Sequence, residues 1–175
     1  MRRPFIVYVK FFFFEPFAKL IRVMPYPPMR VLLLKILGAK IPFSSHVYDT
    51  FFFGMEFGGF YNLNVGKLAH IGRDCLIDLN DRIVLEDNVV LSPRVTLLTH
   101  QSPGITSPML KYYPEVRKPV LIQEGAWVGA NTTILPGVTI GTMSVIAAGS
   151  VVMSDVEPYC MYAGAPAVKK KEMKK

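Results

Sequence analysis

A six-residue repeat dominates the second half of the chain, between residues 122 and 156. A β-branched aliphatic residue returns at every sixth position, and a small or β-branched residue follows each of them four positions later. A period of six fits neither an α-helix, with about 3.6 residues per turn, nor an amphipathic strand. It does fit three short β-segments wound into a coil, each with one aliphatic and one small residue pointing inward. The aliphatic positions are Ile122, Val128, Ile134, Ile140, Ile146 and Val152, and the small positions are Ala126, Thr132, Val138, Ser144, Ser150 and Val156.

The same phase extends upstream with interruptions. Before the clean positions it can be traced only loosely, through bulky residues such as Phe51–Phe53, so we expect a degenerate first coil that closes the end of the stack. From residue 65 to residue 97 the aliphatic residues return at six-residue spacing, apart from one place where two extra residues intervene. The aliphatic positions are Val65, Ile71 and Ile77 before these extra residues, and Leu85, Leu91 and Leu97 after them. In the later coils we expect turns at Gly129, Gly137, Gly141 and Gly149.

The repeat resembles the left-handed parallel β-helix of the hexapeptide-repeat acyltransferases. The handedness comes from the resemblance, since the general rule for parallel crossovers predicts the opposite hand. The Ala-Gly-Ala-Pro-Ala run at residues 163–167 resembles the exit from the β-helix in the maltose, galactoside and polysaccharide O-acetyltransferase branch. We therefore expect an all-β fold, a left-handed parallel β-helix of hexapeptide repeats with a short helical N-terminal segment and an inserted loop.

The chain divides into three segments. Residues 1–40 form a basic and apolar segment in which we expect helices, and residues 41–168 form the β-helix acyltransferase domain. The repeat vanishes at residues 101–118, where closely spaced prolines predict a loop, and a loop of this length inside a repeat fold is more often functional than not. A lysine-rich tail covers residues 169–175.

The N-terminal segment leaves two interpretations open. We expect one helix before Pro25 and another over Pro28–Leu37, and charged residues keep any uncharged run well below the ~20 residues of a spanning helix. The segment is either a flap packed on the end of the β-helix or a peripheral contact with a membrane. No cleavable signal peptide is recognisable, which predicts a cytoplasmic protein, with peripheral contact on the inner membrane face as the open alternative.

The charge and the cysteine content indicate which kinds of partner and which redox compartment suit the chain. A net charge of +7 favours an anionic partner, and a nucleotide-like cofactor, a nucleic acid and an acidic membrane surface all have the required charge. Of these three we expect no nucleic acid. Cys75 and Cys160, the only two cysteines, form neither a disulfide framework nor a metal-ligand spacing, which suits a reducing compartment.

His100 is the candidate catalytic residue. It ends the run Val95-Thr-Leu-Leu-Thr-His and opens the inserted loop. In the O-acetyltransferases that the chain resembles, the catalytic histidine occupies this position, so the resemblance implies the same role for His100. A neutral imidazole can take the proton of an attacking hydroxyl and return it to the departing CoA thiolate. His46 and His70 lack the close spacing of the zinc-binding relatives of this fold, so we expect no metal.

The resemblance also implies acetyl-CoA as co-substrate. Trp127, the only tryptophan, is expected to form a wall for the pantetheine arm, with a packing contact at a subunit interface as the alternative. Small residues align with positions where the family brings main-chain groups up to pantetheine, although the repeat itself also requires them. The tail lysines are expected near the 3′-phosphate, or else are merely solvated. These positions are Ala130, Ala148 and Gly149 for pantetheine, and Lys169, Lys170 and Lys171 for the phosphate.

The sequence indicates the residues of the acceptor site less specifically than it indicates the histidine. Asp78 and Asn80 lie in the coil with the two extra residues, and the counterpart of this coil in sugar acetyltransferases makes polar contacts with the acceptor. Tyr112 and Tyr113 in the loop are alternative platforms for a sugar ring. The resemblance implies an acetyl-CoA-dependent O-acetyltransferase that acts on a hydroxyl of a saccharide as a homotrimer. The basic and apolar N-terminal segment adds a polysaccharide or lipid-linked sugar as an open option for the acceptor, and with it a role in polysaccharide biosynthesis. The alternative is a non-catalytic trimeric β-helix that serves as a scaffold or a membrane-associated assembly module.

Overall fold

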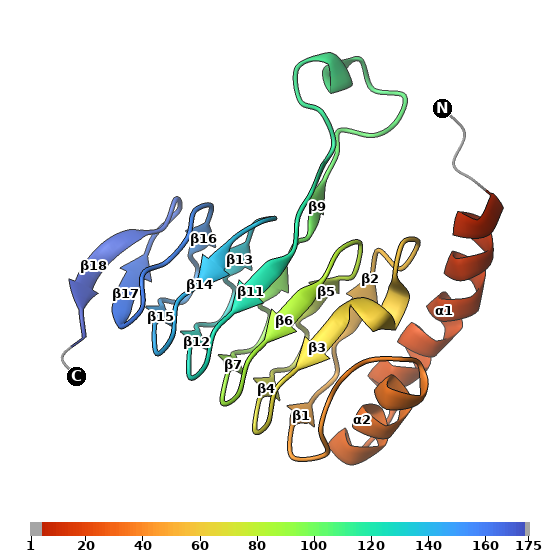
Figure 1. Cartoon of the computed structure of the whole chain (residues 1–175), viewed down its shortest axis with the longest axis horizontal. Helices are drawn as coiled ribbons and strands as arrows, with labels where there is room; N and C mark the ends of the chain where they lie inside the picture. The colour runs from red at the N-terminus through yellow and green to blue at the C-terminus, as the bar shows by residue number, and fades with distance from the viewer. Residues whose placement is uncertain (1–4, 174–175) are drawn as a thin grey trace.

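The computed structural model describes residues 5–173, although not the side chains of residues 5–8, 10 and 11. The first four residues of the segment 1–40 and the last two of the tail 169–175 therefore lie outside the described part. A stack of coils forms the body of the molecule, with two helices at its N-terminal end and a hairpin at its C-terminal end (Figure 1). One long loop projects from the side of the stack.

Three parallel sheets form the faces of the coils, and each complete coil contributes one strand to each face. The first face contains β3 (Leu63–Val65), β6 (Ile83–Leu85), β11 (Val120–Ile122) and β14 (Thr139–Ile140). The second face contains β1 (His46–Val47), β4 (His70–Ile71), β7 (Val90–Leu91), β12 (Trp127–Val128), β15 (Val145–Ile146), β17 (Cys160–Ala163) and the antiparallel β18 (Val168–Glu172). The third face contains β2 (Phe51–Phe53), β5 (Leu76–Asp78), β8 (Thr96–Leu97), β13 (Thr133–Ile134) and β16 (Val151–Val152).

The residues of the six-residue phase fill the interior of the stack. Every in-phase aliphatic residue from Val65 to Val152 is buried, and so are the small residues four positions later. Buried hydroxyl groups at the small positions donate to main-chain carbonyls, as Ser144 does to Glu157 and Ser150 to Ala147, both at 2.6 Å. In the regular coils the register partners are 18 residues apart, as Ile122 and Ile140 are. The parallel β-helix expected from the repeat is therefore confirmed.

The corners of the coils recur at one position of the repeat, where the backbone is left-handed. The third residue after an in-phase position has a positive φ in nine repeats, and most of these residues are not glycine. Gly137 and Gly149, with φ of 86° and 72°, occupy such corners, as expected. Gly129 and Gly141 do not. A Cβ at Gly129 would lie 2.5 Å from the amide nitrogen of Ala148 in the next coil, so this glycine permits close approach of two backbones.

The two helices expected from the sequence are present, and they cover the N-terminal end of the stack. They are α1 (Phe5–Val23) and α2 (Pro27–Ile36), and neither combines the length and hydropathy of a membrane span, as holds for the whole described part of the chain. Phe14 of α1 packs edge-on against Phe60, which lies in the 3₁₀ turn η1 (Gly59–Asn62), and Phe60 packs edge-on against Phe52. These buried aromatic rings close the first, irregular coil.

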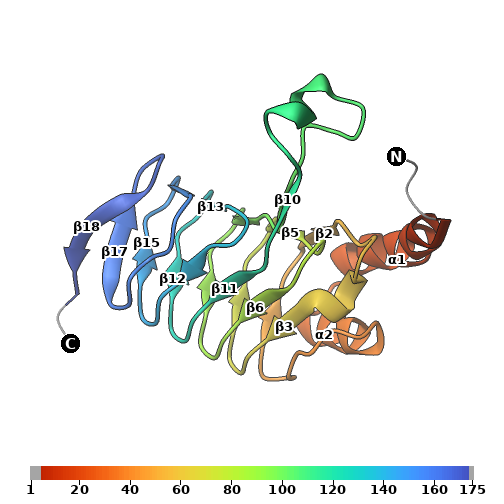
Figure 2. The same cartoon turned by 45° about the horizontal axis from the view of Figure 1, so that its top comes forward.

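The inserted loop is more regular than its prolines suggest. Its arms form an antiparallel pair, β9 (His100–Gln101) and β10 (Val116–Arg117), and a 3₁₀ turn η2 (Pro108–Lys111) lies between them. The arms carry the loop away from the stack, and Figure 2 shows it standing clear of all three faces. Because β9 begins at His100, the loop and the candidate histidine share one element.

Candidate active site

His100 and Asp78 meet at the corner that follows the third face. Asp78 is the last residue of β5, and His100 follows the adjacent strand β8 by three residues. The Nδ1 atom of His100 lies 2.8 Å from Oδ2 of Asp78. The carboxylate is fully buried, whereas the imidazole is 31% exposed.

The hydrogen bonds of Asp78 define the tautomer of His100. Oδ2 accepts the main-chain N–H groups of Thr99 and His100, each at 3.0 Å. Oδ1 accepts the main-chain and side-chain N–H groups of Asn80, at 3.1 and 2.9 Å. Both carboxylate oxygens thus act as acceptors, so Nδ1 carries the proton shared with Oδ2. The ring then keeps Nε2 as its unprotonated nitrogen, the one that can act as a base.

This arrangement corrects the expected role of Asp78 and Asn80. We expected both side chains to contact the acceptor, but the Asp78 carboxylate is closed off from solvent and Asn80 is only 6% exposed. The side-chain nitrogen of Asn80 lies 3.0 Å from Nδ1 of His100, so it too faces the imidazole. Within one chain, Asp78 contacts the imidazole directly, and Asn80 reaches it through Oδ1 of Asp78, to which its side chain donates.

A cavity of about 690 Å³ opens beside the imidazole. His100 lines one part of it, and Tyr112 and Tyr113 of the loop line another, which brings three candidate residues into one space. Pro103, Met109 and Pro114 add apolar surface. Both tyrosine rings are exposed, so they can present flat faces to a ring-shaped ligand.

Two further residues lie near His100 and were not predicted from the sequence. Gly54 has a φ of 70°, and a Cβ there would lie 2.1 Å from Oδ1 of Asp78 and 2.4 Å from the side-chain nitrogen of Asn80. Arg117 is the cross-strand partner of His100, and its guanidinium lies 3.5 Å from the ring centroid of Phe57. Gly54 stood in the irregular first coil, so no repeat marked it. Arg117 could have been found only from the pairing of the loop arms.

Trp127 lies on a different face from His100. It belongs to β12 on the second face, its ring is 52% exposed, and its Nε1 donates to Oγ of Ser92 at 2.9 Å. Ala130 and Gly149 lie at the corner between the second and third faces, joined by a hydrogen bond of 2.8 Å from the Gly149 N–H to the Ala130 carbonyl. Ala148 and Gly149 are exposed, and no atom lies within 4 Å of a Cβ built on Gly149. Within one chain, these residues do not join the cavity at His100.

The tail lysines extend the face that carries Trp127. Lys171 of β18 pairs with Met161, Met161 with Val145, and Val145 with Trp127, so Lys171 stands three strands from the tryptophan, about 14 Å. Lys170 and Lys171 are exposed. Lys169 instead bonds to Glu157 at 2.8 Å and to Glu172 at 2.9 Å, and these carboxylates raise the pKa of the lysine.

The other two histidines form a pair on the second face. His46 and His70 are partners across β1 and β4, with ring centroids 6.4 Å apart, and His100 does not join them. Burial and the neighbouring His46 both lower the pKa of His70. Between residues 5 and 173 no group of three or more histidine, cysteine, aspartate or glutamate side chains is placed to hold a metal ion.

Comparison with known proteins identifies the repeat. Residues 119–154 match the family model described as bacterial transferase hexapeptide (six repeats). A solved hexapeptide-repeat acetyltransferase from Vibrio cholerae, complexed with acetyl coenzyme A, superposes with a TM-score of 0.80 at 25% identity, covering 92% of this chain and 85% of that one. The chain therefore carries the repeat of the bacterial hexapeptide transferases and shares its fold with hexapeptide-repeat acetyltransferases. Its stack therefore has the left-handed β-helix fold expected from the sequence.

Sugar O-acetyltransferases are among the relatives of this hexapeptide-repeat chain. Galactoside O-acetyltransferase of Escherichia coli K12 is 37% identical over 114 residues, 58% of this chain and 52% of the relative. A maltose O-acetyltransferase structure from Clostridium difficile 630 superposes with a TM-score of 0.79 at 26% identity, covering 98% of this chain and 90% of that one. The matched region spans about half the length of the first curated relatives.

The regular repeats of this hexapeptide-repeat chain and its histidine site lie in different coils. The family model covers residues 119–154, whereas Asp78 and His100 lie upstream of it. Register partners on the first face are 20 residues apart between Val65 and Leu85, two more than in the regular coils. The extra residues fall next to Asp78. The departure from the repeat thus places the carboxylate at the corner where His100 arrives.

Proposed function

We propose that the protein is an acetyl-CoA-dependent O-acetyltransferase that acts on a hydroxyl group of a saccharide, with His100 as general base. The observation that carries the proposal is the contact of 2.8 Å between Nδ1 of His100 and the buried carboxylate of Asp78, beside a cavity of about 690 Å³. The relatives named galactoside and maltose O-acetyltransferase support the substrate class. The Vibrio cholerae relative solved with acetyl coenzyme A supports the acetyl donor.

The proposed reaction needs one base and no acyl-enzyme intermediate. The acceptor hydroxyl gives its proton to Nε2 of His100 while its oxygen attacks the thioester carbonyl carbon. The carbon–sulfur bond then breaks, and the imidazolium returns the proton to the departing thiolate. Asp78 holds the imidazole in the required tautomer and stabilises its positive charge while the ring is protonated.

Binding of the acetyl donor would require a second copy of the chain. His100 and Trp127 lie on different faces, so one subunit would supply the base and a neighbour the surface of Trp127, Ala130, Ala148 and Gly149, as in a homotrimer. The exposed Lys170 and Lys171 fit a phosphate group, and Lys169 fits it less well because two carboxylates already hold it.

The loop would hold the acceptor. Sugars pack well against aromatic rings, and Tyr112 and Tyr113 share the cavity with His100. A polysaccharide or lipid-linked sugar suits a cavity formed by a loop that stands clear of the stack. A peripheral contact of residues 1–40 with a membrane would bring such an acceptor close to the enzyme.

The test is thiol release from acetyl-CoA with and without a panel of sugars. The expected result is acceptor-dependent release in the wild type, lowered by on the order of 10²–10⁴ in His100→Ala with an unchanged thermal midpoint. CoA should also raise the thermal midpoint, because it binds only the folded chain. Absence of both effects would favour the alternative, a non-catalytic β-helix scaffold.

A further inference from the structure

Helix α1 has two apolar faces. One face packs on the coils through Phe14, Ala18 and Ile21, which recur at the three- and four-residue spacing of a buried helix face. A second apolar stripe, at about 100° per residue, runs along the opposite side. Its members, all exposed, are Val9, Phe12, Phe13, Leu20 and Val23, and Phe12 is 83% exposed.

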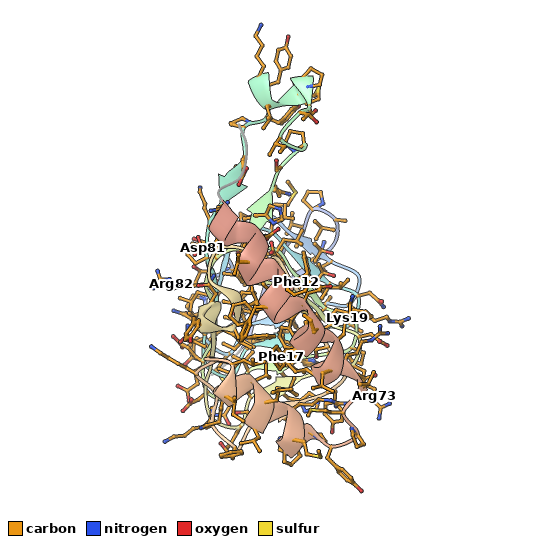
Figure 3. The ribbon with its side chains drawn as sticks, turned by 90° about the vertical axis from the view of Figure 1, so that its right-hand side faces the viewer. Phe12, Phe17, Lys19, Arg73, Asp81 and Arg82 are labelled. Carbon is orange, nitrogen blue, oxygen red and sulfur yellow. The ribbon has the colours of Figure 1, made fainter. Side chains whose placement is uncertain are left out.

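Helix α2 repeats the arrangement. Val31 and Leu34 are buried against the stack, whereas Met29, Leu32 and Ile36 are exposed at spacings of three and four. Ile36 is 71% exposed. Figure 3 views this end of the molecule and draws both helices in front of the coils, with Phe12 and Lys19 labelled on α1. Because both helices bury one face on the same end of the stack, their exposed stripes form one outward surface.

The excess positive charge of the chain lies in the same segment. Residues 1–40 contain eight lysines and arginines and one carboxylate, Glu15, a difference that equals the net charge of +7 of the whole chain. The remaining 135 residues are therefore electrically balanced. In the described part, the exposed cations of the segment are Lys19, Arg22, Lys35 and Lys40.

We propose that α1 and α2 dock this surface, which we call the helical end surface, onto an anionic lipid bilayer without crossing it. A helix that is apolar on both sides and flanked by cations suits the boundary between headgroups and acyl chains. Each lysine or arginine near an anionic surface adds about 1 kcal/mol of attraction, about a fivefold change in affinity. A second copy of the chain is a poorer occupant, because it would bring two segments with the same excess of positive charge face to face.

The experiment is sedimentation of the full chain with vesicles. Phosphatidylcholine vesicles with added phosphatidylglycerol should bind the protein at least about tenfold more tightly than phosphatidylcholine alone, and added salt should release it. The double variant Phe12→Ser/Ile36→Ser should bind about tenfold or more weakly, because each side chain loses the gain from apolar burial. Lys19→Gln/Lys35→Gln should bind the anionic vesicles more weakly and the neutral vesicles unchanged.

Met153→Ser is the matched control, because Met153 is an exposed apolar residue, at 60%, on the far half of the stack. Its vesicle binding should equal that of the wild type. All the substituted side chains are exposed, so the thermal midpoints should stay unchanged. Failure to bind either vesicle would overturn the proposal, and so would a dimer that Phe12→Ser/Ile36→Ser dissociates. Neither outcome depends on acetyl transfer, so the proposal stands or falls separately from the proposed enzyme activity.

Discussion

The Nδ1 atom of His100 lies 2.8 Å from Oδ2 of Asp78, and that carboxylate accepts N–H groups from Thr99 and Asn80 as well. Burying an ionised carboxylate costs free energy unless donors surround it, and here they do. The arrangement stabilises the folded corner and at the same time fixes which ring nitrogen of His100 is free. Stability and the proposed chemistry therefore depend on the same carboxylate.

Asp78→Asn should lower kcat for acetyl transfer by on the order of 10²–10⁴, because an amide cannot accept the Nδ1 proton as well as two main-chain N–H groups. The same change should cost about 1–3 kcal/mol of stability, since donors would face a donor in a buried site. Thiol-release kinetics and urea unfolding measure the two effects. Asp155→Asn is the control, because the Asp155 carboxylate also accepts a main-chain N–H, from Thr139 at 2.7 Å, but far from His100. Equal kcat in Asp78→Asn and the wild type would contradict the orienting role.

Gly54→Ala should lower kcat and leave the KM for acetyl-CoA nearly unchanged. The new Cβ would displace Asp78 and Asn80, which it would approach within 2.1 and 2.4 Å, and the imidazole would lose its fixed orientation. Gly104→Ala is a matched control, because Gly104 also has a positive φ, 97°, but a Cβ there would meet nothing within 4 Å. Alanine at a positive φ strains the backbone by about 1–2 kcal/mol in both variants. A lower kcat in Gly54→Ala than in Gly104→Ala would therefore report the displacement of Asp78 and Asn80. A similar loss of activity in the two would show that strain alone is responsible.

The sequence predicted the stack well because its period records the inward direction of side chains directly. Every in-phase position from Val65 to Val152 is buried. The contact between Asp78 and His100 could not be predicted in the same way, because it depends on the register of neighbouring coils across an irregular stretch. A slip of two residues was visible, but which residues it turned toward His100 was not. Gly54 was hidden for the same reason, in a coil whose repeat is lost.

The N-terminal helices show a different limit. Helices before Pro25 and after it follow from proline positions and apolar spacing, and α1 and α2 lie there. The sequence of α1 has two apolar stripes, so it could not indicate which of them would be buried. The structure assigns the burial to Phe14, Ala18 and Ile21, which leaves Phe12 and Val23 exposed.

The buried thiol of Cys75 should make the free energy of unfolding fall as pH rises into the alkaline range. Burial raises the pKa of its thiol from an ordinary value of 9.0 to about 11. The folded state therefore favours the protonated thiol, and this stabilisation is complete below the unfolded pKa and lost as pH rises through the folded one. Between pH 9 and 11 the wild type should lose about 2 kcal/mol more than Cys75→Ala. Thermal unfolding at a series of pH values checks this, and parallel pH profiles for the two proteins would contradict it.

Mixing two inactive variants should restore activity if the site lies between subunits. His100→Ala chains keep Trp127, and Trp127→Ala chains keep His100, which lies on another face of the stack. In a mixed homotrimer about a quarter of the sites would combine an intact histidine from one chain with an intact tryptophan from its neighbour. Unfolding and refolding the two variants together should therefore recover about that fraction of wild-type turnover at saturating acetyl-CoA. Refolding each variant alone is the control, and it should recover none of the lost activity.

If both residues served a site within one chain, every site in the mixture would lack one of them. A mixture no more active than the average of its parents would then place the site within a single subunit.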